Sequence, residues 1–534
     1  MDKKEVILSL VLSVFVAGGF FYKFFLFGLL PFPGDLLIAE YKPWRSYSFL
    51  GYNPGSYPNK AQYPDTLKQL YPWKTEAIGQ LKNGQLPLWN PHSFSGSPLL
   101  ANFQSAALYP LGVLYFLFSQ PFAWSILVFL QPFLAGLFTY WYCRSIKLSP
   151  LGSALSAVSF SYGSFMTVWL EYNTIGHVIT WLPLALLAIE KRWFTVLILS
   201  LSLPFFAGHP QIATGVYLFS LAYFWIRNRR ITMMFLIPIG IAAVQIVPGI
   251  ELMLNSARSS LSYDFFVDKV LIQPWQLIMA VLPDFFGNPA TRTYWPADTY
   301  IGKVLSIGLV PLFFLLATAR AKGSLKWIFT TTAIIILILA TKNPLTVLLY
   351  QIPQLRSSSP TLFIFLFQFS LAILSGIGLD WFIREHHTTK KLTSRALTVL
   401  AFLSLGFLLV WFYRYPQGYR ALVYATLLIG MTLFMFFIAI GKKHAMTLAL
   451  TIVLLIHIAD LFYAFHKFNP FVPAALVYPP TDVVNFLKER SGIDRIWGYG
   501  TAAIEANFAT QLGLYSPDGY DPRYPKWYGE FINL

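Results

Sequence analysis

Long apolar runs alternate with short polar turns along most of this 534-residue chain. A helix needs roughly 20 mostly apolar residues to cross the hydrocarbon layer, and fewer where it is buried in a bundle. The first run follows MDKK without a small-residue cleavage site, so it is expected to remain as a first span and not to be removed as a signal peptide. The pattern predicts about thirteen membrane helices, several of them short: 6–30, 121–142, 152–170, 175–190, 193–207, 211–226, 231–249, 301–318, 327–341, 361–383, 396–413, 421–441 and 446–464.

Charges between these runs predict the orientation of the chain, because cytoplasmic turns of membrane proteins are enriched in Lys and Arg. If the N-terminus is cytoplasmic, the turns on that side are basic, whereas 171–174 and 208–210 on the other side contain neither Lys nor Arg. We therefore expect a multi-pass protein of the plasma (inner) membrane with a cytoplasmic N-terminus and an extracytoplasmic C-terminus. The basic positions are Arg144, Lys147, Lys191, Arg192, Arg227, Arg229, Arg230, Arg320, Lys322, Lys326, Arg384, Lys390, Lys391, Arg395, Lys442 and Lys443.

Composition supports the prediction of a membrane protein and argues against several other classes of protein. The chain is 56% hydrophobic and 12% charged, with a mean hydropathy of +0.56. Its formal net charge of +16 does not indicate nucleic-acid binding, because the basic residues are spread over many turns instead of forming one patch. A single cysteine, Cys143, excludes an internal disulfide and a cysteine-based metal site. Neither a P-loop nor a Rossmann-type glycine pattern is present, which disfavours chemistry driven by a cytosolic nucleotide.

The widest range of polar residue types is found in the segments predicted to lie outside the membrane on the extracytoplasmic side, which include 31–120 and 465–534. The stretch GQLPLWNPHSFSGSPLLANFQ (84–104) is rich in Pro, Asn, Gly, Ser and aromatic residues and almost free of charge. We expect residues 1–464 to form an all-α transmembrane domain that includes the outer loop 31–120. Residues 465–534 are expected to form a small α/β extracytoplasmic segment.

Two carboxylates in the outer loop are candidates for a general base. Asp35 opens DLLIAEYKPW directly after the first span, and Asp65 opens the similar phrase DTLKQLYPW. A partly desolvated carboxylate beside aromatic rings at the outer membrane surface is suited to accept a proton. The alternative is a helix N-cap or an ordinary surface acid. The sequence does not decide between these roles, nor between the two residues.

Amide, imidazole and indole side chains of the same loop are candidates for binding a sugar. Amides and imidazoles orient hydroxyl groups, and a Trp face suits the apolar side of a pyranose. The alternative is structural, since Asn caps turns and Trp anchors at the membrane interface. That alternative is weaker for Asn102 and Gln104, which have apolar residues on both sides. The candidates are Gln69, Trp89, Asn90, His92, Asn102 and Gln104.

Further candidates for substrate binding lie at the outer ends of predicted spans: His177, His209, Gln211, Arg258, Asp284 and Arg356. His177 and His209, the latter with Gln211 in AGHPQ, lie on different spans without an acid cluster nearby, so structural hydrogen bonding is favoured over metal binding. Arg258 and Arg356 are placed either to hold a lipid phosphate or to meet anionic headgroups, and Asp284 is a further outer-loop charge. No metal site and no required cofactor are predicted, although a divalent cation is compatible with the chemistry considered below.

Several motifs together resemble the YfhO family of bacterial multi-spanning membrane proteins. They are, in order, DTLKQLYPW, GQLPLWNPHSFSGSPLLANFQ, AGHPQIA, LPDFFGN, IPQLRSSSP and SPDGYDP, and 65–110 is the most specific part. The resemblance implies a GT-C type fold in which an acid of the first outer loop is catalytic, a role that would fall to Asp35 or Asp65. It also implies a larger outer domain, so 465–534 is expected to be the beginning of one.

The resemblance further implies transfer of a sugar from a polyprenyl-phosphate carrier to a surface glycan or glycolipid acceptor within the bilayer. An aspartate would act as the base, Arg258 or Arg356 would pair with the phosphate, and a single attack would invert the anomeric carbon. Two rival functions remain open. A transporter or flippase of lipid-linked saccharides would need paired intramembrane charges and two related halves, and a non-catalytic envelope assembly protein would leave the polar residues scattered.

Overall fold

The computed structural model describes residues 3–228, 233–258, 260–384, 406, 415–439, 443–521 and 523–532. Within these residues the protein is helical, and its named strands, β1 (Trp89–Asn90) and β2 (Ser97–Pro98), form one short antiparallel pair. The predicted span 396–413 lies outside the described residues apart from Gly406. So do six of the basic residues used to predict orientation: Arg229, Arg230, Lys390, Lys391, Arg395 and Lys442.

Helices occupy most of the predicted apolar ranges that the structure describes. They are α1 (Lys3–Phe20), α2 (Tyr22–Phe27), α6 (Gln120–Ser145), α7 (Pro150–Ser161), α8 (Ser164–Val168), α9 (Ile175–Lys191), α10 (Phe194–Phe206), α11 (Pro210–Asn228), α12 (Leu236–Leu254), α14 (Leu309–Thr318), α15 (Ser324–Ala340), α17 (Ile364–Arg384), α19 (Pro416–Ala439) and α20 (Lys443–Phe465).

Among the described residues, five helical segments are long and apolar enough to cross a membrane: Gln120–Ser145, Met233–Leu254, Pro360–Arg384, Pro416–Phe437 and His444–Phe468. The chain is therefore a membrane protein. The total of about thirteen spans stays a prediction.

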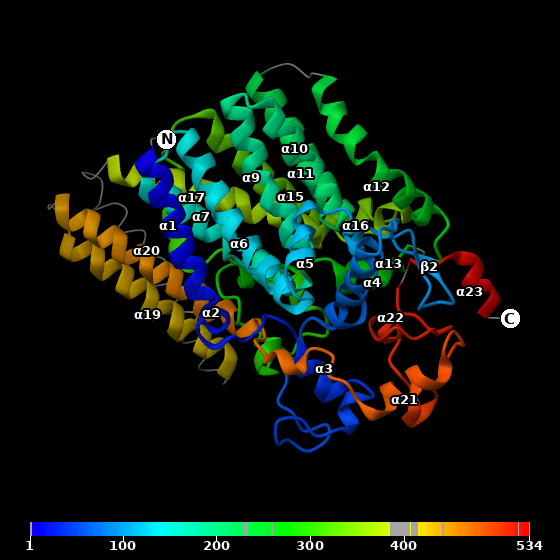
Figure 1. Ribbon diagram of the computed structural model, residues 1–534. Helices are drawn as coiled ribbons and strands as arrows, with labels where there is room; N and C mark the ends of the chain where they lie inside the picture. The colour runs from blue at the N-terminus through cyan, green and yellow to red at the C-terminus, as the bar shows by residue number, and fades with distance from the viewer. Residues whose placement is uncertain are drawn as a thin grey trace.

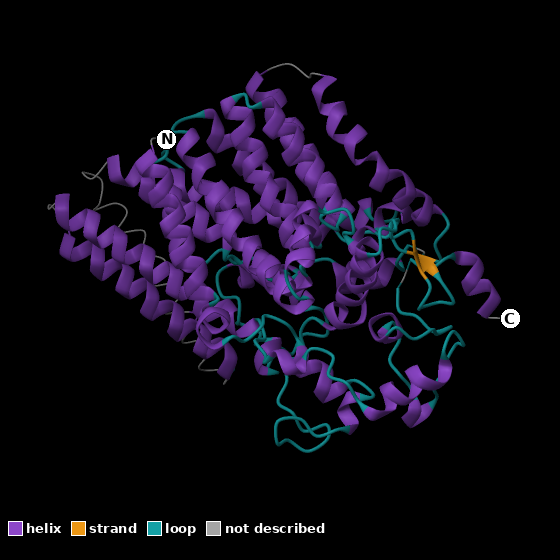
Figure 2. Ribbon diagram, in the orientation of Figure 1, coloured by secondary structure: helices purple, strands orange, loops and turns teal. Residues whose placement is uncertain are grey.

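The bundle has two different ends. Figure 1 shows the N-terminus at the upper left and the C-terminus at the lower right, and Figure 2 shows the long loops gathered toward the lower right. Two ion pairs join basic helix ends on the opposite side: Arg144 of α6 with Glu5 of α1, and Arg227 of α11 with Glu190 of α9. Short basic turns and long outer loops thus lie at opposite ends of the helices, while the side that faces the cytoplasm stays a prediction.

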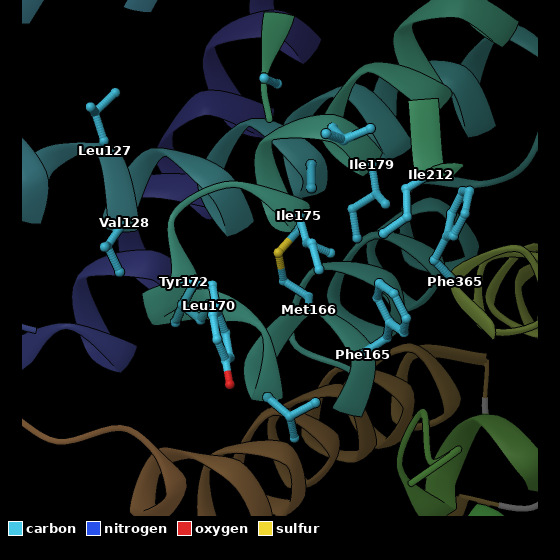
Figure 3. Close-up of a cluster of buried hydrophobic side chains, with 14 of the residues drawn as sticks. Leu127, Val128, Phe165, Met166, Leu170, Tyr172, Ile175, Ile179, Ile212 and Phe365 are labelled. Carbon is cyan, nitrogen blue, oxygen red and sulfur yellow. The ribbon is translucent and has the colours of Figure 1, made fainter. Parts of the chain in front are cut away.

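Small residues allow close helix packing in the centre of the bundle. A Cβ added to Gly376 of α17 would lie 2.2 Å from the Ser156 Oγ and 2.7 Å from the Gly152 carbonyl oxygen of α7, so only glycine fits at this crossing. Next to this crossing, Phe165 and Met166 pack with Ile175 in the buried cluster of Figure 3.

Two predicted spans differ from the helices observed. The range 152–170 breaks into α7 and α8, because the amides of Ser164 and Phe165 donate to Ser306 and Gln368 instead of to the preceding turn. The range 301–318 becomes helical only at Leu309. Gly308 has φ = +92°, and the Leu309 amide donates to the Asp460 carboxylate at 2.8 Å, which begins the helix there.

An outer layer built from the first loop and the C-terminal segment covers one end of the bundle (Figure 1). The backbones of Leu30 and Val472 exchange hydrogen bonds of 2.8 and 2.9 Å, which joins the end of the first span to the segment after α20. The strands expected in the C-terminal segment are not found among its described residues, whose regular structure is helical and short. The helices of the outer layer are α3 (Gly34–Glu40), α4 (Tyr71–Lys82), α5 (Leu114–Leu117), α21 (Asp482–Ser491), α22 (Phe508–Leu512) and α23 (Lys526–Ile532), and two other loops contain α13 (Tyr263–Phe265) and α16 (Pro344–Leu349).

Candidate functional site

Asp35 is held at the junction between the helix bundle and the outer layer. It lies in the first turn of α3, directly after the Leu30–Val472 connection. A Cβ on the preceding Gly34 would lie 2.6 Å from the Leu476 carbonyl oxygen, so the C-terminal segment presses on the backbone here. The position of Asp35 is therefore set by segments from both ends of the chain.

The Asp35 carboxylate is buried, with 7% of the residue exposed. Its Oδ1 accepts a hydrogen bond from the Leu36 amide at 2.9 Å, and its Oδ2 accepts one from the Lys60 amide at 3.1 Å. Burial raises the pKa of Asp35 to about 6, against the opposing effects of these amides and of the Lys60 charge. The carboxylate is thus a stronger base than a solvated one and is still mostly ionised at neutral pH.

Lys60 connects Asp35 to a second carboxyl group. Its Nζ donates to the Asn469 carbonyl oxygen at 3.0 Å. Burial lowers the pKa of Lys60, while the charges of Glu171 and Asp35 act in the opposite direction. One half-buried ammonium group therefore lies within the field of two carboxyl groups.

Glu171 is the second carboxyl group, and the sequence analysis did not single it out. It lies in η5 (Leu170–Tyr172), is fully buried, and neither carboxyl oxygen has a hydrogen-bond partner among the described residues. Burial raises the pKa of Glu171 well above its usual value, Lys60 lowers it, and Asp35 raises it further. Burial thus favours the neutral form of Glu171 more strongly than that of Asp35, so the two neighbouring carboxyl groups differ in their tendency to ionise.

A cavity of about 350 Å³ lies beside this cluster, next to the outer ends of α19 and α20. The short helix η14 (His466–Phe468) separates the two: Phe468 stacks on Tyr300 near the cavity, with ring centroids 5.8 Å apart, and meets Tyr63 edge-on at 5.6 Å on the other side. The wall is largely apolar, with polar side chains that include Asp284, Asn288, Arg420, Tyr424, Asp460 and Lys467.

Asp284, a predicted site residue, belongs to this cavity. It forms an ion pair with Lys467, and its Oδ1 accepts from the Asn288 amide group at 2.8 Å. Arg420 lines the same cavity and is exposed. The cavity thus combines apolar walls with two cationic groups, Arg420 and Lys467, and two acids, Asp284 and Asp460.

Asp65 lies in a different environment from Asp35. Burial raises the pKa of Asp65, and the charge of Lys68 lowers it. Lys68 forms an ion pair with Glu505 at 3.3 Å and lies over the ring of Tyr41. Gln69 donates to the Tyr520 carbonyl oxygen at 2.8 Å. Asp65 and Gln69 are therefore directed toward the C-terminal segment and not toward Lys60 and Glu171.

The polar residues of the stretch 84–104 hold the outer layer together. The Asn90 side chain donates to the Thr510 hydroxyl at 3.1 Å. The His92 Nδ1 is 2.8 Å from the Leu514 carbonyl oxygen, and its Nε2 is 3.4 Å from Glu76. Trp89 is exposed. Asn90 and His92 thus dock the C-terminal segment, and binding of a sugar by any of the three stays a prediction.

Asn102 and Gln104 contribute to a third cluster. The Asn102 amide group donates to Asp521 at 3.4 Å, and the Gln104 backbone amide donates to the Asn102 side chain. The pKa of His209 is lowered to about 3 by burial, and the charges of Arg523 and Arg258 act in the same direction. Arg258 is therefore near His209 and the C-terminal segment.

The remaining predicted residues are separate from Asp35. His177 is bonded to Asn173 at 3.1 Å and to Tyr109 at 3.3 Å, which is a structural arrangement. The Gln211 side chain donates to the Ser359 carbonyl oxygen at 2.7 Å. Arg356 donates to the Tyr350 carbonyl oxygen at 3.4 Å. Among the described residues there is no group of three or more His, Cys, Asp or Glu side chains that is placed to hold a metal ion.

Comparisons with known proteins give a weak likeness only. No family model matches the chain, and no curated protein matches it in sequence. Among solved structures, it is similar to ArnT from Cupriavidus metallidurans bound to undecaprenyl phosphate, with a TM-score of 0.46 and 13% identity over 88% of this chain and 84% of that one. For the apo state of ArnT the TM-score is 0.41 and the identity 12%, over 84% and 82%. At this level the likeness carries no conclusion, so the GT-C type fold and the YfhO family stay predictions.

Proposed function

We propose that the protein is a membrane glycosyltransferase of GT-C type that moves a sugar from a polyprenyl-phosphate carrier to an extracytoplasmic glycan or lipid-linked acceptor. The observation that carries the proposal is the environment of Asp35. Its carboxylate is buried where the bundle meets the outer layer, has a pKa raised to about 6, and lies in the field of Lys60 and Glu171. These are properties of a general base that works near neutral pH.

In the proposed reaction Asp35 accepts the proton of an acceptor hydroxyl as that oxygen attacks the anomeric carbon of the donor. The bond between this carbon and the phosphate oxygen breaks, and polyprenyl phosphate leaves with the bonding electrons. A single displacement of this kind inverts the anomeric carbon. The new negative charge develops on the leaving phosphate, and the charge of Lys60 keeps Asp35 ionised before the reaction by lowering its pKa.

The cavity beside η14 is the proposed binding site of the polyprenyl-phosphate donor. A donor used outside the cytoplasm must arrive on a lipid, with its phosphate at headgroup depth and its isoprenoid chain in the bilayer. Lys467 and Arg420 are cationic partners for the phosphate in this cavity, and the apolar wall is suited to the chain. They take this role in place of Arg258 and Arg356, because Lys467 and Arg420 line the cavity and those two arginines do not; the phosphate would compete with Asp284 for Lys467.

The deciding experiment is sugar transfer from a synthetic polyprenyl-phosphate sugar by purified protein in nanodiscs. We expect Asp35→Asn to lower the transfer rate by about 10²-fold or more, the usual effect of losing a general base. Asp65→Asn tests the other carboxylate of the loop, and Asp494→Asn, at an exposed position in the C-terminal segment, is the matched control. Each variant must keep the thermal unfolding midpoint of the wild type.

Full turnover by Asp35→Asn would remove Asp35 as the base. Loss of transfer in Asp65→Asn alone would move that role to Asp65. Absence of transfer by the wild type from every polyprenyl-phosphate sugar supplied would contradict the proposed function itself.

A further inference from the structure

The C-terminal segment contains a second cavity, of about 190 Å³, that is not part of the site described above. It lies between the end of α21 and the beginning of α22, and its floor is formed by aliphatic side chains such as Leu487, Ile496 and Ile504. Polar residues of its lining are Glu505, Asn507, Ser516 and Asp518. The cavity therefore has an apolar floor and acceptor groups at its side.

An exposed pair of aromatic rings borders this cavity. Trp497 lines it and is 53% exposed, and Tyr499 is 71% exposed, with the two ring centroids 5.4 Å apart. Large aromatic side chains left this open cost free energy in water unless a ligand covers them. Their flat faces match the apolar face of a sugar ring.

The two carboxylates retain capacity to bind hydroxyl groups. One Glu505 oxygen pairs with Lys68, and one Asp518 oxygen accepts the Gly519 amide at 2.9 Å. The other oxygen of each has no hydrogen-bond partner among the described residues. An ionised carboxylate only accepts hydrogen bonds, so its natural partner is a donor such as a hydroxyl.

Charge distinguishes this cavity from the one beside η14. Its wall includes two acids and, within the described part of the chain, no Lys, Arg or His. An anionic headgroup would meet like charge here and be disfavoured, whereas a neutral saccharide would not. The ligand class indicated is a neutral sugar.

The cavity is also within reach of Asp35. Glu505 on its wall pairs with Lys68, which lies over the Tyr41 ring at 4.7 Å. Tyr41 directly follows α3, whose first turn contains Asp35, and a seven-residue helix is about 10 Å long. Glu505 on the cavity wall is thus connected to Asp35 through Lys68, Tyr41 and α3, and α3 lies in the lower part of Figure 1 with α21 and α22.

From these observations we propose that the cavity between α21 and α22 is a subsite for a neutral saccharide chain, and that this chain is the acceptor of the transfer reaction. The second half of this statement rests on the proposed function. The first half, that the cavity binds a neutral saccharide, stands without it.

The test is direct binding to the full-length protein in nanodiscs, measured by saturation-transfer NMR without any donor. The probes are neutral trisaccharides of glucose, galactose, mannose and N-acetylglucosamine, and one sulfated trisaccharide. We expect a neutral trisaccharide to bind and the sulfated one not to. Trp497→Ala should weaken binding about tenfold, the loss of one stacked aromatic contact, and Trp497→Phe should retain most of it. Trp527→Ala is the matched control, because Trp527 is 59% exposed in the same segment and does not line the cavity.

Three results would overturn the subsite: no binding of any neutral trisaccharide, equal binding of the sulfated one, or the same loss in Trp527→Ala as in Trp497→Ala. Repeating the measurement with Asp35→Asn separates the two proposals. If the protein binds the trisaccharide but transfers no sugar, the saccharide subsite is retained and the proposed enzyme activity is rejected. If transfer depends on Asp35 but no trisaccharide binds, the enzyme activity is retained and only the subsite is rejected. If both hold, Trp497→Ala should raise the KM for the acceptor and leave the KM for the donor unchanged.

Discussion

The charge of Lys60 should set the pH at which the proposed base becomes active. Lys60→Met removes the ammonium group, but the backbone amide that donates to Asp35 remains. Because the Lys60 charge lowers the pKa of Asp35, its removal raises that pKa, and the base is then ionised only at higher pH. The Lys60 Nζ donates to Asn469 and acts on Asp35 through its charge alone, and a nearby opposite charge shifts the pKa of a carboxyl by about one unit. Asp35 itself begins with a pKa raised to about 6 by burial.

The expected result is a kcat/KM profile whose acid limb has its midpoint near pH 6 in the wild type and about one pH unit higher in Lys60→Met. At pH 6 about half of the Asp35 carboxylate is ionised in the wild type and about one tenth in Lys60→Met. When each rate is divided by that protein's own maximum at high pH, the variant is therefore about fivefold slower than the wild type at pH 6. Lys342→Met is the control, because this outer-loop lysine pairs with Asp268 instead. An acid limb that does not move in Lys60→Met, or that moves equally in the control, would refute the proposed coupling.

Three further predictions concern the structure around the site. Gly34→Ala should lower the thermal unfolding midpoint, with a cost of about 1–3 kcal/mol, because the added Cβ meets the Leu476 carbonyl oxygen at 2.6 Å; Gly18→Ala, with nothing within 4 Å, should not, and equal midpoints would contradict the close approach. Glu171→Gln should leave the midpoint at pH 7 nearly unchanged, because burial raises the pKa of Glu171 and so favours its neutral form; a large loss would show that it is ionised and paired. Asn90→Ala should increase trypsin cleavage in the C-terminal segment, since it removes the hydrogen bond to Thr510 and leaves the His92 backbone amide without its partner, at a cost of about 1–3 kcal/mol, whereas the exposed Asn83→Ala should not; unchanged cleavage would show that Asn90 does not dock the segment.

Most of the helices could be predicted because a membrane-crossing helix must be apolar along its whole length. The hydropathy of a segment is a local property, so it can be recognised without knowledge of the fold. It failed where a distant side chain replaced a helical hydrogen bond, as the Asp460 carboxylate does at Leu309 and Gln368 does at Phe165. These contacts join residues 151 and 203 positions apart, so the hydropathy of the local sequence does not contain them.

The candidate site was predictable only in part. Asp35 could be found because it directly follows the first apolar run. Glu171 could not, since it is a single acid in a short turn without a motif, and only the fold brings it near Lys60. The amides and imidazole of 84–104 were recognised as unusual. The structure places Asn90 and His92 against the C-terminal segment. The sequence could not distinguish this role from ligand binding, because the same side chains serve both.

The hydrogen bonds between Leu30 and Val472 have a consequence for biosynthesis. Asp35 is synthesised early, but the residues around it are synthesised later. Lys60 and Glu171 follow, and Asn469 and Val472, which contact Lys60 and Leu30, come after the last described membrane helix. A nascent polypeptide that has inserted all but its last membrane helix therefore still lacks the environment that would make Asp35 basic. The proposed base therefore acquires its complete surroundings only after α20 and the segment that follows it have been synthesised.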